Sequence, residues 1–145
     1  MVINVKLFPY KSVIFDCDGV LLNSNQIKTD AFYQTVLPYG ENIAKLFAEY
    51  HKKNGGISRN KKFKYFLKNM VPSKKIKLGL TELLNNYASI VFNALSECEV
   101  CEGLEAIRKQ DPEVKWFVIS GGNELEIKRV FKEKKISGYF DGGIF

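Results

Sequence analysis

The stretch VIFDCDGV, residues 13–20, predicts an α/β fold. Its first three residues are apolar and predict a short buried strand, which ends at two aspartates, Asp16 and Asp18, followed by Gly19. In open α/β sheets, ligands bind beyond the carboxyl ends of the strands. Because side chains alternate along a strand, Asp16 and Asp18 can face one site while Cys17 faces the other way. We therefore expect a site at the end of this strand.

The pair of carboxylates indicates a divalent cation. Like charges this close are unfavourable unless a cation, or a proton shared with a substrate, neutralises them. Mg²⁺ takes oxygen ligands and commonly binds through one or two carboxylates together with phosphate oxygens. Asp16 and Asp18 are therefore the candidate metal ligands. The alternative is a strand followed by an Asp-Gly turn without any chemistry.

A second apolar run, WFVISGG at residues 116–122, repeats this pattern. It predicts a strand that ends at Ser120 and Gly121, followed by a helix over residues 124–134. A serine hydroxyl and backbone amides at the start of a helix can hold a phosphate group. The alternative is a strand, a turn and a helix with an ordinary serine cap. Two strand ends that both carry polar groups favour a phosphate site. Residues 142–145 resemble the opening of a third strand.

The residues between the two motifs have a helical period. Phe63, Phe66, Leu67 and Met70 follow the spacing of one helix face, and apolar residues from Ile76 to Ala94 predict a longer helix. Such stripes are typical of a helical core. We expect an all-helical unit over residues 23–97, inserted into an α/β unit formed by residues 1–22 and 98–145 with a parallel sheet.

Composition limits the function classes. The 145-residue chain has a net charge of +6, and no apolar segment is long enough to cross a membrane. Its start is too short and interrupted for a signal peptide, so we expect a cytoplasmic protein. The three cysteines include one CxxC pair, at 98 and 101, without further zinc ligands, which favours reduced structural thiols. Nothing resembles a nucleic-acid-binding motif, and the lysines suit either an anionic ligand or a solvated surface.

The two motifs resemble those of the haloacid dehalogenase superfamily of phosphohydrolases. The matching residues are FDCDGVLL at 15–22 and VISGG at 118–122, and the helical stretch lies where the family inserts its subclass I cap. Within that stretch, GGISR at 55–59 is similar to the cap loop of the beta-phosphoglucomutase and phosphoglycolate phosphatase branch. The resemblance implies a Rossmann-like core with an inserted helical cap. It also implies a phosphatase that acts on a small phosphorylated metabolite.

The resemblance also implies a role for each matching residue. Asp16 would be the nucleophile that forms an aspartyl-phosphate, and Asp18 would be the general acid and base. Mg²⁺ would bind the Asp16 carboxylate and the main-chain carbonyl of Asp18. Ser120 and the amide of Gly121 would hold the phosphoryl oxygens. The substrate contacts implied from the cap are Ser58, Arg59 and Lys62.

The sequence departs from the family pattern in two ways. The family has a lysine after its third strand and acidic residues after its fourth, and neither position occurs before Phe145. On that basis we expect weak or no activity, an incomplete sheet and self-association through its edge. Lys28 stands where the mutase branch has a histidine, which favours a phosphatase over a sugar phosphomutase. A further alternative is a fragment that only binds phosphate ligands or a partner.

Overall fold

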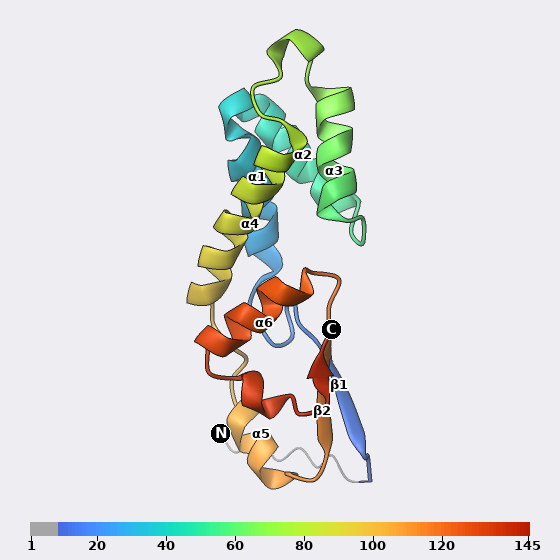
Figure 1. The fold of residues 1–145 in the computed structure, drawn as a ribbon, viewed down its shortest axis with the longest axis vertical. Helices are drawn as coiled ribbons and strands as arrows, with labels where there is room; N and C mark the ends of the chain where they lie inside the picture. The colour runs from blue at the N-terminus through green and yellow to red at the C-terminus, as the bar shows by residue number, and fades with distance from the viewer. Residues whose placement is uncertain (1–8) are drawn as a thin grey trace. The chain divides into compact units, whose positions relative to one another are not determined.

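The computed structural model describes residues 9–145 and divides the chain into two compact units. One unit contains the residues up to Ser24 together with Leu95–Phe145, and the other contains Asn25–Ala94. Figure 1 shows the elements of each unit in chain order.

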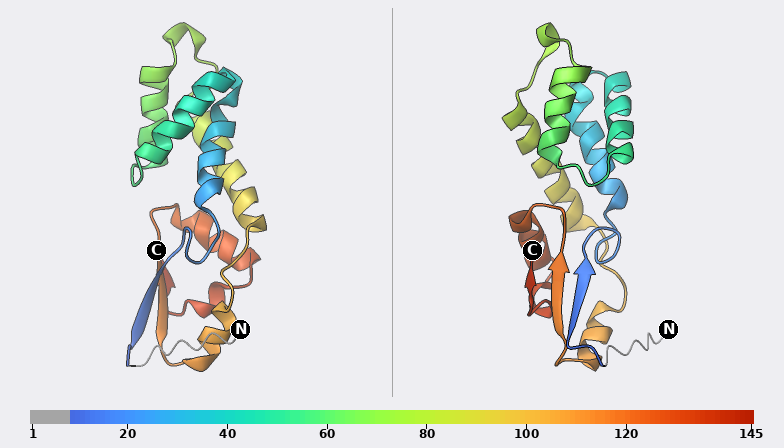
Figure 2. Two further views of the ribbon diagram at one scale, coloured as in Figure 1. Left: turned by 180° about the vertical axis from the view of Figure 1, so that it is seen from behind. Right: turned by 90° about the vertical axis from the view of Figure 1, so that its right-hand side faces the viewer.

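The first unit is built on a parallel sheet, as the α/β prediction requires. In the described part of the chain its strands are β1 (Ser12–Asp16), β2 (Lys115–Ile119) and β3 (Gly143–Ile144), in the order β1-β2-β3. Figure 2 shows them side by side and running in the same direction. Asp16 is in register with Ile119, so both strands end at the same edge of the sheet.

One face of this sheet packs against helices. Trp116 and Val118 of β2 point to that face and are fully buried, and the ring of Phe15 lies 4.8 Å from that of Trp116. The helix α6 (Glu124–Glu133) buries Phe131 against Phe140. The helix α5 (Leu104–Gln110) places Arg108 over the Trp116 ring. The apolar core of the α/β unit therefore lies on this side.

The opposite face carries exposed apolar side chains. Because side chains alternate along a strand, Ile14 and Ile119 point away from the core, and both are exposed. Phe145, directly after β3, is exposed as well. The backbone of Gly142 lies close to the Phe117 ring, since a Cβ at this position would be 2.6 Å from it. The described residues thus leave one apolar face of the sheet uncovered.

The second unit is all helical, with an aromatic core. Its elements are α1 (Asn25–Val36), η1 (Leu37–Tyr39), α2 (Glu41–Lys53), α3 (Arg59–Tyr65), η2 (Phe66–Met70), η3 (Ser73–Lys75) and most of α4 (Leu80–Glu97). Phe32, Phe47, Phe63, Phe66 and Tyr87 are buried, and their neighbouring ring centroids lie 4.4–5.7 Å apart. The apolar stripes therefore form a core, as their period predicted.

The helix expected to start near Ile76 begins instead at Leu80. The backbone amide of Gly79 donates a hydrogen bond to Glu82 Oε2 at 2.7 Å, an arrangement that caps a helix at this position. Ile76 lies outside the helix and is partly exposed, so its agreement with the apolar period was a coincidence. Within residues 9–145, no helix is both long and apolar enough to cross a bilayer.

Candidate functional site

Asp16 is the last residue of β1, and its side chain is exposed. Its Oδ1 accepts a hydrogen bond from the backbone amide of Cys17 at 2.7 Å, which fixes the orientation of the carboxylate. Because Asp16 is in register with Ile119, Ser120 follows on the neighbouring strand at the same edge of the sheet. The structure thus brings together the two strand ends that the sequence singled out.

Asp18 lies in a tight loop that the following residues hold in place. The amides of Leu21 and Leu22 both donate to the carbonyl of Cys17 at 3.0 Å, and Gly19 has a φ of +73°, which favours glycine. The segment that follows is tied to the start of the CxxC region by two backbone hydrogen bonds, Asn23 to Glu99 and Cys101 to Leu21. The position of the Asp18 backbone is therefore fixed by contacts on both sides of the loop.

Ser24 orients the Asp18 side chain, a contact that the sequence did not predict. The Ser24 hydroxyl donates to Asp18 Oδ1 at 2.7 Å, and Ser24 is fully buried. Ser24 directly precedes α1, where a serine is normally interpreted as a helix cap. In the sequence, a serine before a helix indicates a cap, and this more common interpretation gave no sign of the contact with Asp18.

The turn after β2 contains Ser120 and Gly121, the residues expected to bind phosphate. Ser120 Oγ accepts a hydrogen bond from the amide of Gly122 at 3.1 Å, which leaves the hydroxyl proton to be donated elsewhere. Gly121 is exposed beside it, and a Cβ at Gly122 would lie 3.0 Å from Ile127. Asn123 Oδ1 caps α6 by accepting from the amide of Glu126. The Ser120 hydroxyl thus lies four residues before α6, whose first turn carries Glu124 and Glu126, and its role in phosphate binding stays a prediction.

The oxygen donors near Asp16 fit Mg²⁺. The exposed Asp16 carboxylate and the main-chain carbonyl of Asp18 supply hard oxygen ligands, and Mg²⁺ usually keeps several waters besides one or two carboxylates. Within residues 9–145 there is no cluster of three or more acidic, histidine or cysteine side chains that could hold a metal. Water and phosphate oxygens would have to complete the coordination, and the binding of Mg²⁺ by Asp16 and Asp18 stays a prediction.

Ser58 and Arg59 lie at the start of α3 in the helical unit. Ser58 is the N-cap of this helix, and its hydroxyl accepts from the amide of Lys61 at 3.4 Å. The Arg59 guanidinium lies 5.3 Å from the centroid of the Tyr87 ring, a cation–π contact. The expected role of these two residues in substrate binding stays a prediction.

Lys62, the third expected substrate contact, is only 2 % exposed and packs inside the helical unit. Its Nζ lies 2.7 Å from His51 Nδ1 and 5.3 Å from the centroid of the Phe32 ring. Burial lowers the pKa of Lys62, with a further contribution from Lys28. The observed setting of Lys62 is thus that of a buried donor to His51, a pairing that sequence reasoning did not suggest.

His51 is the acceptor in this pair. Burial, followed by the charges of Lys62, Lys28 and Lys52, lowers its pKa from 6.5 to about 4. The imidazole is therefore neutral at physiological pH, and its Nδ1 can accept a hydrogen bond from the Lys62 ammonium. The His51 ring also packs on Phe32, with centroids 4.4 Å apart. His51 thus has a packing role in the helical unit.

The CxxC residues are free thiols. Cys98 and Cys101 are both partly buried, and burial is the main cause that raises the pKa of each thiol. A raised pKa keeps sulfur protonated and weakens it as a nucleophile or metal ligand. The structure therefore gives these cysteines no feature of a reactive pair.

Comparisons with known proteins identify the family of this chain. A family model for haloacid dehalogenase-like hydrolases matches residues 10–145. The chain therefore belongs to the haloacid dehalogenase-like hydrolase family. No sequence among the curated proteins matches it.

Solved structures share the fold over nearly the whole chain. YfnB from Bacillus subtilis, solved bound to magnesium, has a TM-score of 0.65 at 11 % identity over 94 % of this chain. CbbY from Rhodobacter sphaeroides, in complex with xylulose-(1,5)bisphosphate, has a TM-score of 0.64 at 16 % identity over 93 %. A haloacid dehalogenase-like family hydrolase from Streptococcus pneumoniae has a TM-score of 0.61 at 16 % identity over 94 %. At these identities the likeness concerns the fold.

The chain is shorter than these relatives. It spans 64 % of the YfnB chain, 62 % of the CbbY chain and 60 % of the Streptococcus pneumoniae hydrolase. The described fold therefore corresponds to somewhat less than two thirds of each of them.

Proposed function

We propose that this protein is a Mg²⁺-dependent phosphatase that hydrolyses a small phosphorylated metabolite through an aspartyl-phosphate on Asp16. The observation that carries the proposal is the pairing of β1 with β2, which places Asp16 and Ser120 at one edge of the sheet, with Asp18 held by Ser24. Membership of the hydrolase family supports the reaction class. The bisphosphate bound to CbbY and the magnesium in YfnB support the substrate class and the cofactor.

In the first step, an oxygen of Asp16 attacks phosphorus and the bond to the leaving oxygen breaks. Asp18 in its protonated form donates its proton to that oxygen, and the Ser24 hydroxyl holds the carboxyl group in place. Ser120 donates to a phosphoryl oxygen, because its Oγ already accepts from Gly122. When bound, Mg²⁺ screens the repulsion between the carboxylate and the phosphoryl group.

In the second step, Asp18 takes a proton from a water molecule that attacks the same phosphorus. The Asp16–phosphorus bond breaks, inorganic phosphate leaves and both aspartates return to their starting states. Asp16 needs no proton in either step, which agrees with its exposed position and with the hydrogen bond that it accepts from the Cys17 amide. The proposal thus gives the two aspartates separate roles.

The proposal is tested with the purified protein, a panel of phosphorylated metabolites and p-nitrophenyl phosphate, each with and without Mg²⁺. We expect Mg²⁺-dependent phosphate release, which Asp16→Asn abolishes because an amide cannot form the acyl phosphate. Asp18→Asn should reduce kcat by roughly 10²–10⁴-fold, the usual share of a general acid and base. Turnover at the wild-type rate by Asp16→Asn would refute the mechanism.

A non-catalytic function has its own signature in the same experiment. A protein that only binds phosphate ligands would show saturable binding of the metabolites by calorimetry and no phosphate release in any variant. Transfer of the phosphoryl group between positions of a sugar, without release of phosphate, would instead identify a phosphomutase. Each result replaces the phosphatase proposal with one of its alternatives.

A further inference from the structure

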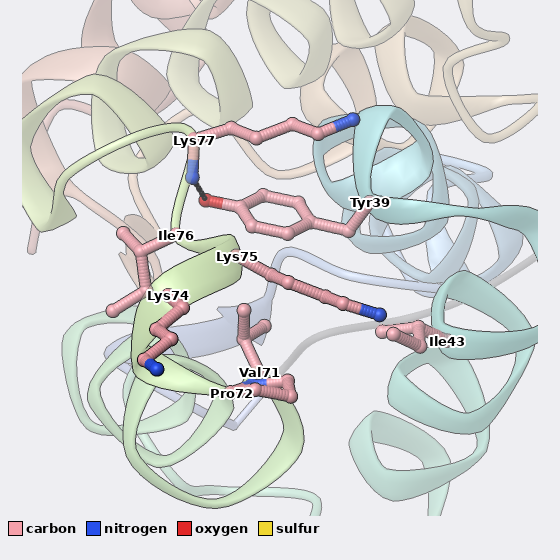
Figure 3. Close-up of a pocket in the computed structure, with 8 residues that line it drawn as sticks. All are labelled: Tyr39, Ile43, Val71, Pro72, Lys74, Lys75, Ile76 and Lys77. Carbon is pink, nitrogen blue, oxygen red and sulfur yellow. Dashed lines mark hydrogen bonds between the residues drawn. The ribbon is translucent and has the colours of Figure 1, made fainter.

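The helical unit contains a cavity of about 390 Å³ that no part of the proposed reaction uses. It lies between the end of η1, α2 and the segment over residues 71–77 (Figure 3). Its walls include the apolar side chains of Tyr39, Ile43, Val71 and Ile76. The volume falls within the range of roughly 300–1,000 Å³ that is typical of small-molecule sites. The cavity therefore has the size and the apolar lining of a ligand pocket.

One wall of this pocket is fixed in place by hydrogen bonds. The Tyr39 hydroxyl donates to the carbonyl of Leu78 at 2.9 Å and accepts from the amides of Leu78 at 2.8 Å and Lys77 at 3.2 Å. The Tyr39 ring packs edge-on against Phe66, with centroids 5.2 Å apart. A wall that is already ordered reduces the entropy lost on binding. The pocket is thus preformed on the side of Tyr39.

The charge of the pocket is positive. Three lysines, at positions 74, 75 and 77, belong to its lining, and no acidic residue does. Lys77 Nζ donates to the carbonyl of Pro38 at 2.6 Å. Lys74 and Lys75 have no ion-pair partner within residues 9–145. The Lys75 side chain extends across the pocket toward Ile43 (Figure 3). Two cations therefore border an apolar pocket without a counter-charge.

We propose that this pocket binds a small organic anion with a flat apolar body, such as an aromatic carboxylate. The apolar body would contact Tyr39, Ile43, Val71 and Ile76, and the carboxylate would pair with Lys75 and Lys74. The apolar contacts supply most of the affinity, and the ammonium groups select the sign of the charge. The lining residues include none of the candidate catalytic or substrate-binding residues, so the site is a second one.

The experiment uses 2-naphthoate as the probe, with 2-naphthamide and inorganic phosphate as matched ligands. Binding to the full chain is measured by calorimetry and by NMR chemical shifts. We expect saturable binding of 2-naphthoate, with shifts centred on residues 39–43 and 71–77, and an affinity about 5-fold higher than that of 2-naphthamide. The factor corresponds to roughly 1 kcal/mol for a partly exposed ion pair. Equal affinities for the two naphthyl ligands, or tighter binding of phosphate alone, would overturn the proposal.

Variants connect the binding to these residues. Lys75→Met should weaken 2-naphthoate binding about 5-fold and leave 2-naphthamide unchanged, since only the charge is removed. Lys61→Met, on the exposed surface of α3, is the matched control and should leave both unchanged. Ile43→Glu should abolish binding of 2-naphthoate, with the fold checked by circular dichroism. An equal loss in Lys61→Met and Lys75→Met, or full binding in Ile43→Glu, would show that the ligand does not occupy this pocket.

Discussion

At the scale of single residues, the settings of two polar side chains depend on contacts that are remote in sequence. Ser24 reaches back across the loop to Asp18, and Lys62 reaches His51 on another helix. Both donors are buried, so each contact excludes water from a hydrogen bond that would be weaker at the surface. Asp16, Asp18 and Ser120 could be predicted as site residues because they follow apolar runs. No sequence pattern indicates the supporting contacts from Ser24 and Lys62.

Ser24→Ala should lower kcat about 10-fold without abolishing turnover. The variant removes the hydroxyl that orients the Asp18 carboxyl group, and it leaves both aspartates in the chain. Loss of a buried hydrogen bond should also lower the free energy of unfolding by about 1 kcal/mol. Steady-state kinetics and urea unfolding measure the two effects. Ser96→Ala, which removes a solvent-exposed hydrogen bond to Glu133, is the control and should leave kcat unchanged.

The neutral state of His51 makes stability depend on pH. The folded-state pKa is about 4, against 6.5 for a solvated histidine, so the unfolded chain binds more protons between these values. The free energy of unfolding should therefore fall as the pH decreases from 6.5 to 4, and the part due to His51 should be about 1–2 kcal/mol after allowance for its partial exposure.

His51→Gln isolates this contribution, because glutamine does not titrate and can still accept a hydrogen bond from Lys62. Urea unfolding at several pH values between 4 and 7 gives the free energy of unfolding of wild type and variant. The carboxylates titrate in both proteins, so the difference between the two isolates His51. A loss of stability that is equal in the two proteins would mean that His51 titrates normally in the folded state.

At the scale of elements, the strands and the helices after them were predictable, and one helix start was not. The apolar runs that end at glycine-containing motifs predicted the positions of β1, β2 and α6 to within one residue. The apolar period continued through Ile76, but the chain between Pro72 and Gly79 forms a turn and loop, and the Gly79–Glu82 bond starts α4. Periodicity alone does not contain this capping contact, which depends on one polar side chain.

Arg59 is the first residue of α3. Arg59→Ala should raise KM for the physiological phosphorylated substrate and leave KM for p-nitrophenyl phosphate nearly unchanged, because a small ester makes few contacts beyond the phosphoryl group. Kinetics with both substrates measure the split. Arg59→Lys keeps the positive charge and should recover part of the loss.

The loss of the cation–π contact with Tyr87 is a separate effect of the same variant. It should reduce the free energy of unfolding by about 0.5–1 kcal/mol, which thermal unfolding detects. A rise in KM of the same size for both substrates would show that Arg59 acts through the stability of α3 alone.

At the scale of the whole molecule, the exposed apolar face of the sheet has an effect on association. Parallel sheets are normally covered on both faces, and here one face carries Ile14, Ile119 and Phe145 in contact with solvent. β1 also lies at an edge of the described sheet, where its backbone can pair with another chain. We propose that this 145-residue chain self-associates through this face and edge.

Matched substitutions test this association. Ile14 on the sheet and Leu46 on α2 are both 62 % exposed, so a lysine at either site should change the stability of the folded monomer by a similar amount. We expect the apparent mass in size-exclusion chromatography to rise with concentration in wild type and in Leu46→Lys. Ile14→Lys should elute as a monomer at the same concentrations. A monomeric wild type, or equal behaviour of the two variants, would contradict association through the sheet.

The buried Trp116 makes the α/β unit visible to fluorescence independently of the helical unit. It is the only tryptophan in the chain, it is fully buried, and its ring contacts both the Phe15 ring and the Arg108 guanidinium. Its emission therefore shifts to longer wavelength when the sheet core opens to water, whereas far-ultraviolet circular dichroism is dominated by the helices. Comparing the two signals during denaturation tells whether the units unfold as one cooperative body or in sequence.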